Sequence, residues 1–320
     1  MILKSLKESR RLLLVTHVRP DGDAIGSILA LGRGLSLMGK TVRLYNESPI
    51  PAIFRFLPGI EQIVSDPGPL SDYDTAVALD CSDLSRVGGL ADAVSRIPTL
   101  INIDHHLTNT GFGAHQMIDP AASSTGELVY QILMDLGIAI DSAMAYAIYT
   151  AIFTDTGSFL FQNTNPKAFY ICGRMVELGV NSYTVAQKLF ATYSLGRLKL
   201  LNMVLDTIQI SRNGKLSVMY LTQEMLRETE TSVDDINGLV NYAKHIEDVQ
   251  VAVLIQESQR LPGGGDRSHY HVSLRSNGPV DVAAIAESYG GGGHSGAAAY
   301  TTYTSLAEIK KNVFRLSDIF

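Results

Sequence analysis

Short apolar runs alternate with segments of helical periodicity through the first half of the chain. Four runs have the length of a strand and end in a polar residue: RLLLVTH at 11–17, TVRLYN at 41–46, DTAVALD at 74–80 and TLINID at 99–104. Between and after them, apolar residues recur at helical spacing over 23–39, 124–136, 141–154 and 165–178. This alternation is typical of an α/β fold with a mainly parallel sheet, which we expect over residues 1–190.

The pattern changes after residue 190. A connecting helix is expected within 191–205, and a smaller α+β domain over 206–320. The stretch at 208–222 alternates around Asn213-Gly214, a dipeptide that is a strong hairpin signal. Residues 249–258 and 269–276 predict a second hairpin on either side of the glycine-rich segment LPGGGDR.

Composition narrows the range of functions. The chain is 46% hydrophobic and 18% charged, and its start, MILKSLKESRR, lacks the apolar region of a signal peptide, so we expect a soluble cytoplasmic protein. The two cysteines, Cys81 and Cys172, form no CxxC pair, which favours a reducing compartment and no structural zinc site. The formal net charge of −6 argues against a protein that grips long nucleic acid through many phosphates.

Aspartate and histidine residues follow several predicted strands and one predicted helix: His17, Asp21, Asp23, Asp80, Asp104, His105, His106 and Asp155. Any one of these acids alone is more typical of a helix cap or a turn. The strands of an open parallel sheet, however, end at a common crevice, so the repeated placement indicates one shared site.

So many carboxylates at one site repel one another unless cations compensate their charge. Carboxylate and imidazole ligands without thiolates suit Mn²⁺, Mg²⁺, Fe²⁺ or Zn²⁺, and the number of ligands is sufficient for two ions. Two such ions can lower the pKa of a shared water toward neutrality, so no thiol nucleophile is required. We therefore expect Cys81 to be a small packing residue and not a nucleophile.

The same residues carry a family resemblance. The segments HVRPDGDAIGS, LDCSD, DHH and TDTGSF resemble, in order and approximate spacing, the four motifs of the DHH phosphoesterase superfamily. The later segment VDVAAIAESYGGGGHSGAAA resembles the DHH-associated domain. The match spans nearly the whole chain and is greatest to the stand-alone type that acts as an oligoribonuclease (nano-RNase) and as a phosphatase of 3′-phosphoadenosine-5′-phosphate (pAp). It implies a DHH catalytic domain over 1–190 and a substrate-binding domain over 206–320.

The resemblance also implies roles for the residues at the strand ends. One divalent ion, Mn²⁺ before other metals, would be held by His17, Asp21 and Asp80, and a second by Asp23, Asp80, His105 and Asp155. Asp80 would bridge the two ions. His106 would lie near the scissile phosphate and Asp104 would orient its neighbours, so these two residues and Asp80 form the expected catalytic set.

The expected substrates and partners follow from the same resemblance. Substrate phosphate would be bound by Arg275, Gly291, Gly292, Gly293 and His294. The expected reactions are hydrolysis of RNA of about two to five nucleotides to mononucleotides and removal of the 3′-phosphate of pAp, with the dinucleotide pApA as a further substrate. Neither a long duplex nor a membrane is an expected partner, and the oligomeric state stays open, with a homodimer among the assemblies considered.

Three other functions stay open at this point: an inorganic pyrophosphatase, a phosphodiesterase of linear or cyclic dinucleotides, and a nucleotide-binding protein without activity. A pyrophosphatase would be expected to enclose its anion with a basic cluster, whereas this chain offers a glycine-rich loop with one histidine and a distant arginine. A GxGxxG pattern at Gly291, Gly293 and Gly296 follows a predicted helix instead of a strand, so it does not indicate a dinucleotide fold. The chain departs from the family at Leu160 and at Ala298-Ala299, which bears on substrate preference.

Overall fold

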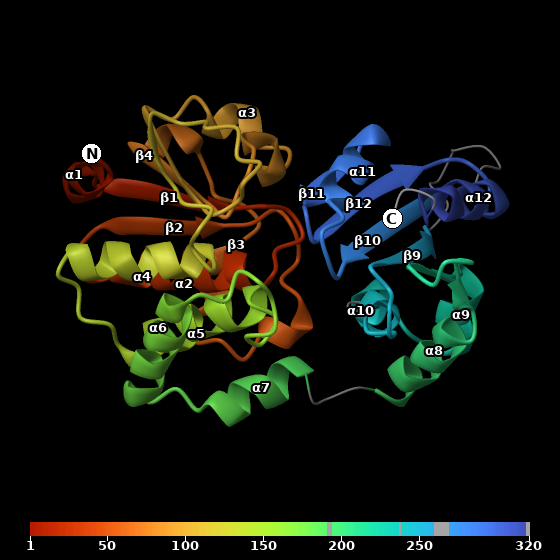
Figure 1. Ribbon diagram of the computed structural model, residues 1–320. Coiled ribbons are helices and arrows are strands. Elements are labelled where there is room, and N and C mark those ends of the chain that lie inside the picture. Colours follow the sequence, from red (N-terminus) through yellow and green to blue (C-terminus); the bar gives the residue numbers. More distant parts are fainter. Residues whose placement is uncertain (191–193, 237, 259–268, 318–320) are drawn as a thin grey trace. The chain divides into compact units, whose positions relative to one another are not determined.

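The computed structural model describes residues 1–320 except 191–193, 237, 259–268 and 318–320. Its contacts divide the chain into two compact units, Met1–Thr192 and Tyr193–Phe320. Each unit has a six-stranded sheet of its own (Figure 1). The predicted fold class is confirmed, because the first sheet is parallel and the second, in the smaller unit, is mixed.

The sheet of the first unit reverses its strand order at its centre. Side by side, its strands are β3 (Ile63–Val64), β2 (Thr41–Tyr45), β1 (Arg11–Thr16), β4 (Thr75–Leu79), β5 (Thr99–Asp104) and β6 (His115–Ile118). The chain proceeds outward from β1 to β3 on one side and from β4 to β6 on the other. In doubly wound sheets, ligands bind beyond the carboxyl ends of the strands at such a reversal, here between β1 and β4.

Helices cover both faces of this sheet. They are α1 (Ile2–Glu8), α2 (Gly22–Leu37), α3 (Ala91–Val94), α4 (Thr125–Asp135), α5 (Ser142–Asp155), α6 (Pro166–Glu177) and α7 (Ser182–Phe190), with short 3₁₀ helices η1 (Ala52–Phe54), η2 (Ile60–Gln62), η3 (Leu70–Asp72) and η4 (Leu84–Val87). Leu12 and Leu14 of β1 pack in one core with α2, α4, α5 and α6, whereas Leu13 and Val15 pack in another with η4 and α3. Because successive strand residues face opposite sides, burial of both faces produces the continuous apolar runs of the sequence.

Helices α2 and α5 cross closely because α2 carries glycine at the crossing. A Cβ atom on Gly26 would lie 2.3 Å from the Ala147 carbonyl oxygen, and one on Gly22 would lie 2.3 Å from Thr154 Oγ1. Asp23 lies in the first turn of α2 and Asp155 is the last residue of α5. The close crossing therefore brings these two acids to the same end of the helix pair.

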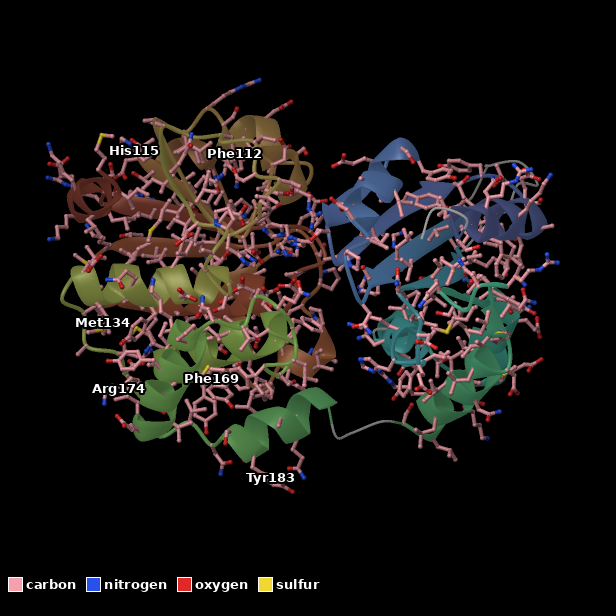
Figure 2. All side chains as sticks on the ribbon, in the orientation of Figure 1. Phe112, His115, Met134, Phe169, Arg174 and Tyr183 are labelled. Atoms are coloured by element: carbon pink, nitrogen blue, oxygen red, sulfur yellow. The ribbon has the colours of Figure 1, made fainter. Side chains whose placement is uncertain are left out.

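Helix α6 shows how well the helical pattern locates an element. Its residues Ile171, Cys172 and Met175 are buried against the sheet-side core, whereas Phe169 and Arg174, both labelled in Figure 2, are among its exposed residues. The three helices predicted at 124–136, 141–154 and 165–178 agree with α4, α5 and α6 to within one residue at each end. The buried spacing of three and four residues explains this agreement.

The second unit has a mixed sheet. Its strands, side by side, are β11 (Gly292–His294), β12 (Ala297–Thr302), β10 (Tyr270–Ser276), β9 (Val251–Glu257), β8 (Leu216–Leu221) and β7 (Gln209–Ile210). Strands β7 and β8 form the antiparallel hairpin predicted around Asn213-Gly214, with Gly214 at φ +76°. Strands β9 and β10 also pair antiparallel, and the glycine-rich segment predicted between them lies outside the described residues.

Two cores hold this sheet between helices. The helices are α8 (Leu195–Leu205), α9 (Gln223–Glu228), η5 (Val233–Ile236), α10 (Leu239–Lys244), α11 (Val282–Ser288) and α12 (Leu306–Leu316). The helix expected as a connection is α8, and its Leu200 and Val204 pack with Met219 of β8 and Leu254 of β9. Helix α8 is therefore a packed part of the second unit.

Candidate functional site

The predicted metal ligands gather where the central strands of the first sheet end. His17 directly follows β1, Asp80 directly follows β4, and His105 directly follows β5. Asp21 is the N-cap of α2, where its Oδ1 accepts hydrogen bonds from the backbone of Asp23 and Ala24 at 3.0 Å, and two further ligands come from the first turn of α2 and the last residue of α5. Asp21 is thus both a helix cap, as expected for a single acid, and a member of the shared site that the repeated placement of acids predicts.

The potential ligand atoms form three overlapping groups, each with all its atoms within 4.8 Å of one another: His17, Asp21 and Asp80; Asp23, His105 and Asp155; and Asp80, His105 and His106. The Asp80 carboxylate connects them, since its Oδ2 lies 3.5 Å from His17 Nε2 and its Oδ1 lies 3.9 Å from His105 Nε2. Its two oxygens therefore face two different groups of ligands.

The backbone of Asp80 has an unusual conformation. Its φ of +59° lies in the left-handed region, which aspartate enters more readily than most residues, and its N–H donates to the Ile103 carbonyl at 3.0 Å. The Thr125 hydroxyl donates to Asp80 Oδ1 at 3.1 Å. Residues held in sparsely populated conformations concentrate at functional sites. The surrounding hydrogen bonds thus fix the turn that presents Asp80 at the end of β4.

The amino terminus of α4 holds Asp23. The N–H groups of Thr125 and Gly126 donate to the two carboxylate oxygens at 2.6 and 2.8 Å, and the Ser27 hydroxyl donates at 3.1 Å. Unpaired N–H groups at a helix start favour a negative charge. No sequence motif points to Thr125 as a site residue, although the Ser-x-x-Glu capping pattern from Ser124 marks the start of this helix.

His106 and Asp104 form a hydrogen-bonded pair beside the ligands. Nδ1 of His106 lies 2.7 Å from Asp104 Oδ1, and the Asn109 amide donates to Asp104 Oδ2 at 2.5 Å. Burial alone would lower the pKa of His106, but the hydrogen bond that it donates to Asp104 and the charges of Asp80 and Asp104 raise it to about 9. Asp104 therefore orients its neighbour and favours the charged imidazolium, a contact that the sequence analysis expected without Asn109.

The carboxylates of the site carry more negative charge than the neighbouring histidines balance, which favours binding of cations. Burial, followed by the charges of Asp80 and Asp155, holds the pKa of Asp23 well above its usual range, and burial with the charges of Asp21 and Asp80 does the same for Asp155. Burial would lower the pKa of His17, yet hydrogen bonds with Asp21 and Asp80 raise it to about 11. Protons thus offset part of the negative charge, and the oxygen and imidazole donors fit divalent cations in their place.

Cys81 does not join this donor set. It is fully buried beside Asp80, and its thiol lies 3.4 Å from the Leu79 carbonyl oxygen. Burial, together with the charges of Asp80 and Asp104, holds the pKa of the Cys81 thiol well above its usual range. A buried neutral thiol is the packing residue that the sequence analysis expected.

In the second unit, strand register brings Arg275 and His294 to one face of the sheet. Arg275 pairs with Ala297 of β12, and Ala297 pairs with His294 of β11. Directly paired residues project from the same face, so the small Ala297 side chain lies between the two. Leu274 and Ala298 project from the opposite face into the core of this unit.

The glycine-rich segment expected as a loop forms the edge strand β11. A Cβ atom on Gly291 would lie 2.1 Å from the Ala299 carbonyl oxygen, and one on Gly293 would lie 2.5 Å from that of Ala297. These two glycines therefore allow close pairing with β12. Gly292 differs, because a Cβ there would meet nothing within 4 Å. Strand pairing thus explains Gly291 and Gly293 without a ligand, but it does not explain Gly292.

A further cation lies near Arg275. Burial lowers the pKa of Arg275, and burial with the charge of Arg275 lowers the pKa of Lys244, the last residue of α10. Two neighbouring cations that are both partly removed from water are a suitable environment for an anion. Lys244 was not among the predicted site residues, since no motif marks the end of this short helix.

None of the described helices is both long enough and apolar enough to cross a membrane.

The search for related families matches the N-terminal domain of the DHH family over residues 11–152 and the DHHA1 domain over residues 213–316. The first match contains seven of the eight acidic and histidine residues considered above, and Asp155 follows it by three positions.

Individual relatives extend the similarity over most of the chain. A bifunctional oligoribonuclease and PAP phosphatase, NrnA, from Thermus thermophilus is 35% identical over 292 residues, which are 90% of this chain and 83% of the relative. The Bacillus subtilis protein of the same name is 28% identical over 94% of this chain and 93% of its own. The crystal structure of an exopolyphosphatase-related protein from Bacteroides fragilis superposes with a TM-score of 0.90 at 28% identity, covering 98% of this chain and 93% of that one. The chain therefore belongs to the DHH family of phosphoesterases and carries a DHHA1 domain in its second unit.

Proposed function

We propose that this protein is a hydrolase that uses two divalent cations, Mn²⁺ in particular, to cleave RNA of about two to five nucleotides and to remove the 3′-phosphate of pAp. The observation that supports it best is the position of Asp80, whose two carboxylate oxygens face two groups of metal-ligating side chains. The relatives from T. thermophilus and B. subtilis are named for the same pair of reactions. The dinucleotide pApA belongs to the same class of short substrate.

The side chains of the first unit have separable tasks in this proposal. Cations bound there would stabilise the charge that develops on the phosphoryl oxygens and would lower the pKa of water. Asp80 fixes the spacing of the two groups of ligands. Asp104 keeps His106 oriented and, with the pKa of His106 raised to about 9, positively charged near neutral pH, which suits contact with the scissile phosphate.

The second unit binds a phosphate of the substrate in this proposal. Arg275 and His294 project from one face with Ala297 between them, and Lys244 adds a neighbouring positive charge. Gly292, on the same face as His294, leaves the backbone open to close approach by a ligand. A binding site with only a few positively charged side chains matches a substrate with few phosphates. This is the reason for the proposed preference for short RNA.

A panel of substrates assayed side by side in Mn²⁺ tests this function. It contains pAp, pApA, RNA from two to twenty-four nucleotides in length, and pyrophosphate. We expect kcat/KM to be highest for about two to five nucleotides, to decline for longer RNA and to be very low for pyrophosphate, because extra phosphates find few further cations. Equal processing of the longest strand, or pyrophosphate turnover above that of every nucleotide, would contradict the proposal.

Variants of the second unit separate substrate recognition from metal binding. Arg275→Ala and His294→Ala each remove a proposed phosphate contact worth roughly 1.5–3 kcal/mol, so kcat/KM should fall about ten- to a hundredfold while Mn²⁺ binding is unchanged. Arg212→Ala, at an exposed arginine in the turn between β7 and β8, is the control and should keep wild-type kinetics. Wild-type kinetics of both test variants would place the substrate contacts elsewhere.

The cellular setting is a smaller part of the proposal. Two buried cysteines without a disulfide suit the reducing cytoplasm. Assembly as a homodimer stays a prediction, which light scattering of the purified protein tests directly.

A further inference from the structure

Asp155 occupies an unfavourable position for a carboxylate. It is the last residue of α5, and no basic residue lies in the last turn of that helix. The carboxyl end of a helix carries a partial negative charge from its unpaired carbonyl groups, which repels an acid there. A ligand in this position needs hydrogen-bond donors that hold it.

Asn163 supplies those donors. Its side-chain amide nitrogen lies 3.0 Å from Asp155 Oδ2, 3.1 Å from the Asp155 carbonyl oxygen and 2.8 Å from the Ser123 carbonyl oxygen. One amide group thus contacts the carboxylate, satisfies a carbonyl at the end of α5 and ties both to the loop before α4. Asp155 Oδ2, the oxygen that Asn163 contacts, is also the one that lies 3.4 Å from His105 Nε2.

Ser123, whose carbonyl oxygen Asn163 contacts, is itself held in place by hydrogen bonds. Ser123 is fully buried, and both its N–H and its hydroxyl donate to Glu127 Oε2, at 2.9 and 2.8 Å. The Asn165 amide donates to the same Glu127 oxygen at 2.9 Å, and its own carbonyl oxygen accepts from the N–H of Ala168 at the start of α6. The segment that carries Asn163 is therefore held to α4 on one side and begins α6 on the other.

We propose that Asn163 is a positioning residue for Asp155: it holds the carboxylate at the end of α5 in the orientation that completes a cation site with Asp23 and His105. The inference rests on the proposed metal centre. Hydrogen-bond partners that orient a metal ligand typically change metal affinity by about ten- to a hundredfold when they are removed. Because Asn163 contacts Asp155 and none of His17, Asp21 or Asp80 in the hydrogen bonds described, its effect should be confined to one of the two cation sites.

Binding of Mn²⁺ alone, without substrate, tests this role by electron paramagnetic resonance and calorimetry on the full chain. Asn163→Leu keeps a side chain of similar size without donors, and Asn163→Ala is a second variant should leucine impair folding. Asp155→Asn marks which binding step belongs to this site. Asn181→Ala is the matched control, because it removes the side-chain oxygen that accepts a hydrogen bond from the N–H of Thr184 at the start of α7 but no contact with Asp155 or with the residues that hold Asn163.

We expect both Asn163 variants to weaken one of two Mn²⁺ binding steps by about tenfold or more and to leave the other unchanged. The weakened step should be the one that Asp155→Asn weakens. Asn181→Ala should lower the melting temperature and keep both affinities. Unchanged Mn²⁺ affinities in folded Asn163 variants, or equal weakening of both steps, would overturn the inference. Wild-type protein that binds no Mn²⁺ would instead overturn the proposed function itself.

Discussion

Asp80 is the residue that the two groups of proposed metal ligands share. Its side chain is 2% exposed, its oxygens face His17 on one side and His105 on the other, and its backbone is held in the left-handed region. Its neighbour in the same motif, Asp83, instead caps η4 through the N–H of Ser85. Two aspartates of one short motif thus have different tasks, which makes them a matched pair for mutation.

Asp80→Asn should be the most damaging isosteric change in the site. It removes a charge shared by both groups of ligands, and loss of several kcal/mol of transition-state stabilisation lowers kcat/KM on a dinucleotide by about a thousandfold or more. Asp21→Asn, which affects one group, should cost less, and Asp83→Asn should keep near wild-type kcat/KM. An Asp80→Asn protein as active as Asp83→Asn would show that Asp80 is not a shared ligand.

At the scale of elements, the start of α4 does more than begin a helix. Its Ser124 and Glu127 form the cap, while Thr125 contacts two of the proposed ligands, through its N–H to Asp23 and through its hydroxyl to Asp80. A helix start that faces buried carboxylates combines favourable partial charge with direct hydrogen bonds. The position of α4 therefore orients ligands that come from two other segments.

Thr125→Val tests this role, because it removes the hydroxyl and keeps the shape of the side chain. We expect Mn²⁺ affinity to fall about tenfold as Asp80 loses a donor. Thr150→Val is the control, since Thr150 is equally buried but its hydroxyl has no hydrogen-bond partner in the described structure. Calorimetric titration with Mn²⁺ measures both. Equal Mn²⁺ affinities of the two variants would show that the Thr125 hydroxyl does not contribute to the site.

The buried thiol of Cys172 in helix α6 leads to a prediction about stability at alkaline pH. Burial raises the pKa of Cys172 to about 12, so the folded protein keeps this thiol protonated where an unfolded chain ionises it near pH 9. Stability from the protonated thiol is therefore complete below pH 9 and is lost as the pH rises toward 12. Alkylation of Cys172 in the native protein should stay slow from pH 7 to 10 and become fast in denaturant. Rapid native labelling at pH 9 would contradict the burial of this helix face.

The elements also show what a sequence can and cannot predict. His17, Asp80 and His105 could be predicted as site residues because each follows an apolar run that forms a strand. Parallel pairing of these strands then brings their ends together. Thr125 escaped prediction, since its contact with Asp80 spans 45 positions and depends on how α4 packs. Strand β11 was expected as a loop because glycine has low strand propensity, and only its close pairing with β12 explains the strand.

At the scale of the whole molecule, the chain separates two kinds of chemistry. The described residues that could hold metal all lie in the first unit, and the residues proposed to bind phosphate lie in the second, each unit with cores of its own. The chain carries 26 basic and 32 acidic residues, so its overall charge does not attract long nucleic acid. In the proposed mechanism, attraction for phosphate comes from the two cations and a few local side chains, which favours small substrates.

Hydrolysis of a dinucleotide during titration of metal-free protein with Mn²⁺ tests the central claim most directly. Turnover should be absent without metal and should appear as the second equivalent binds, because both groups of ligands that share Asp80 must be filled. The Asp80→Asn protein should show no such rise over the same range. Full turnover by metal-free protein, or a rate that reaches its maximum with one bound Mn²⁺, would contradict a two-cation phosphoesterase.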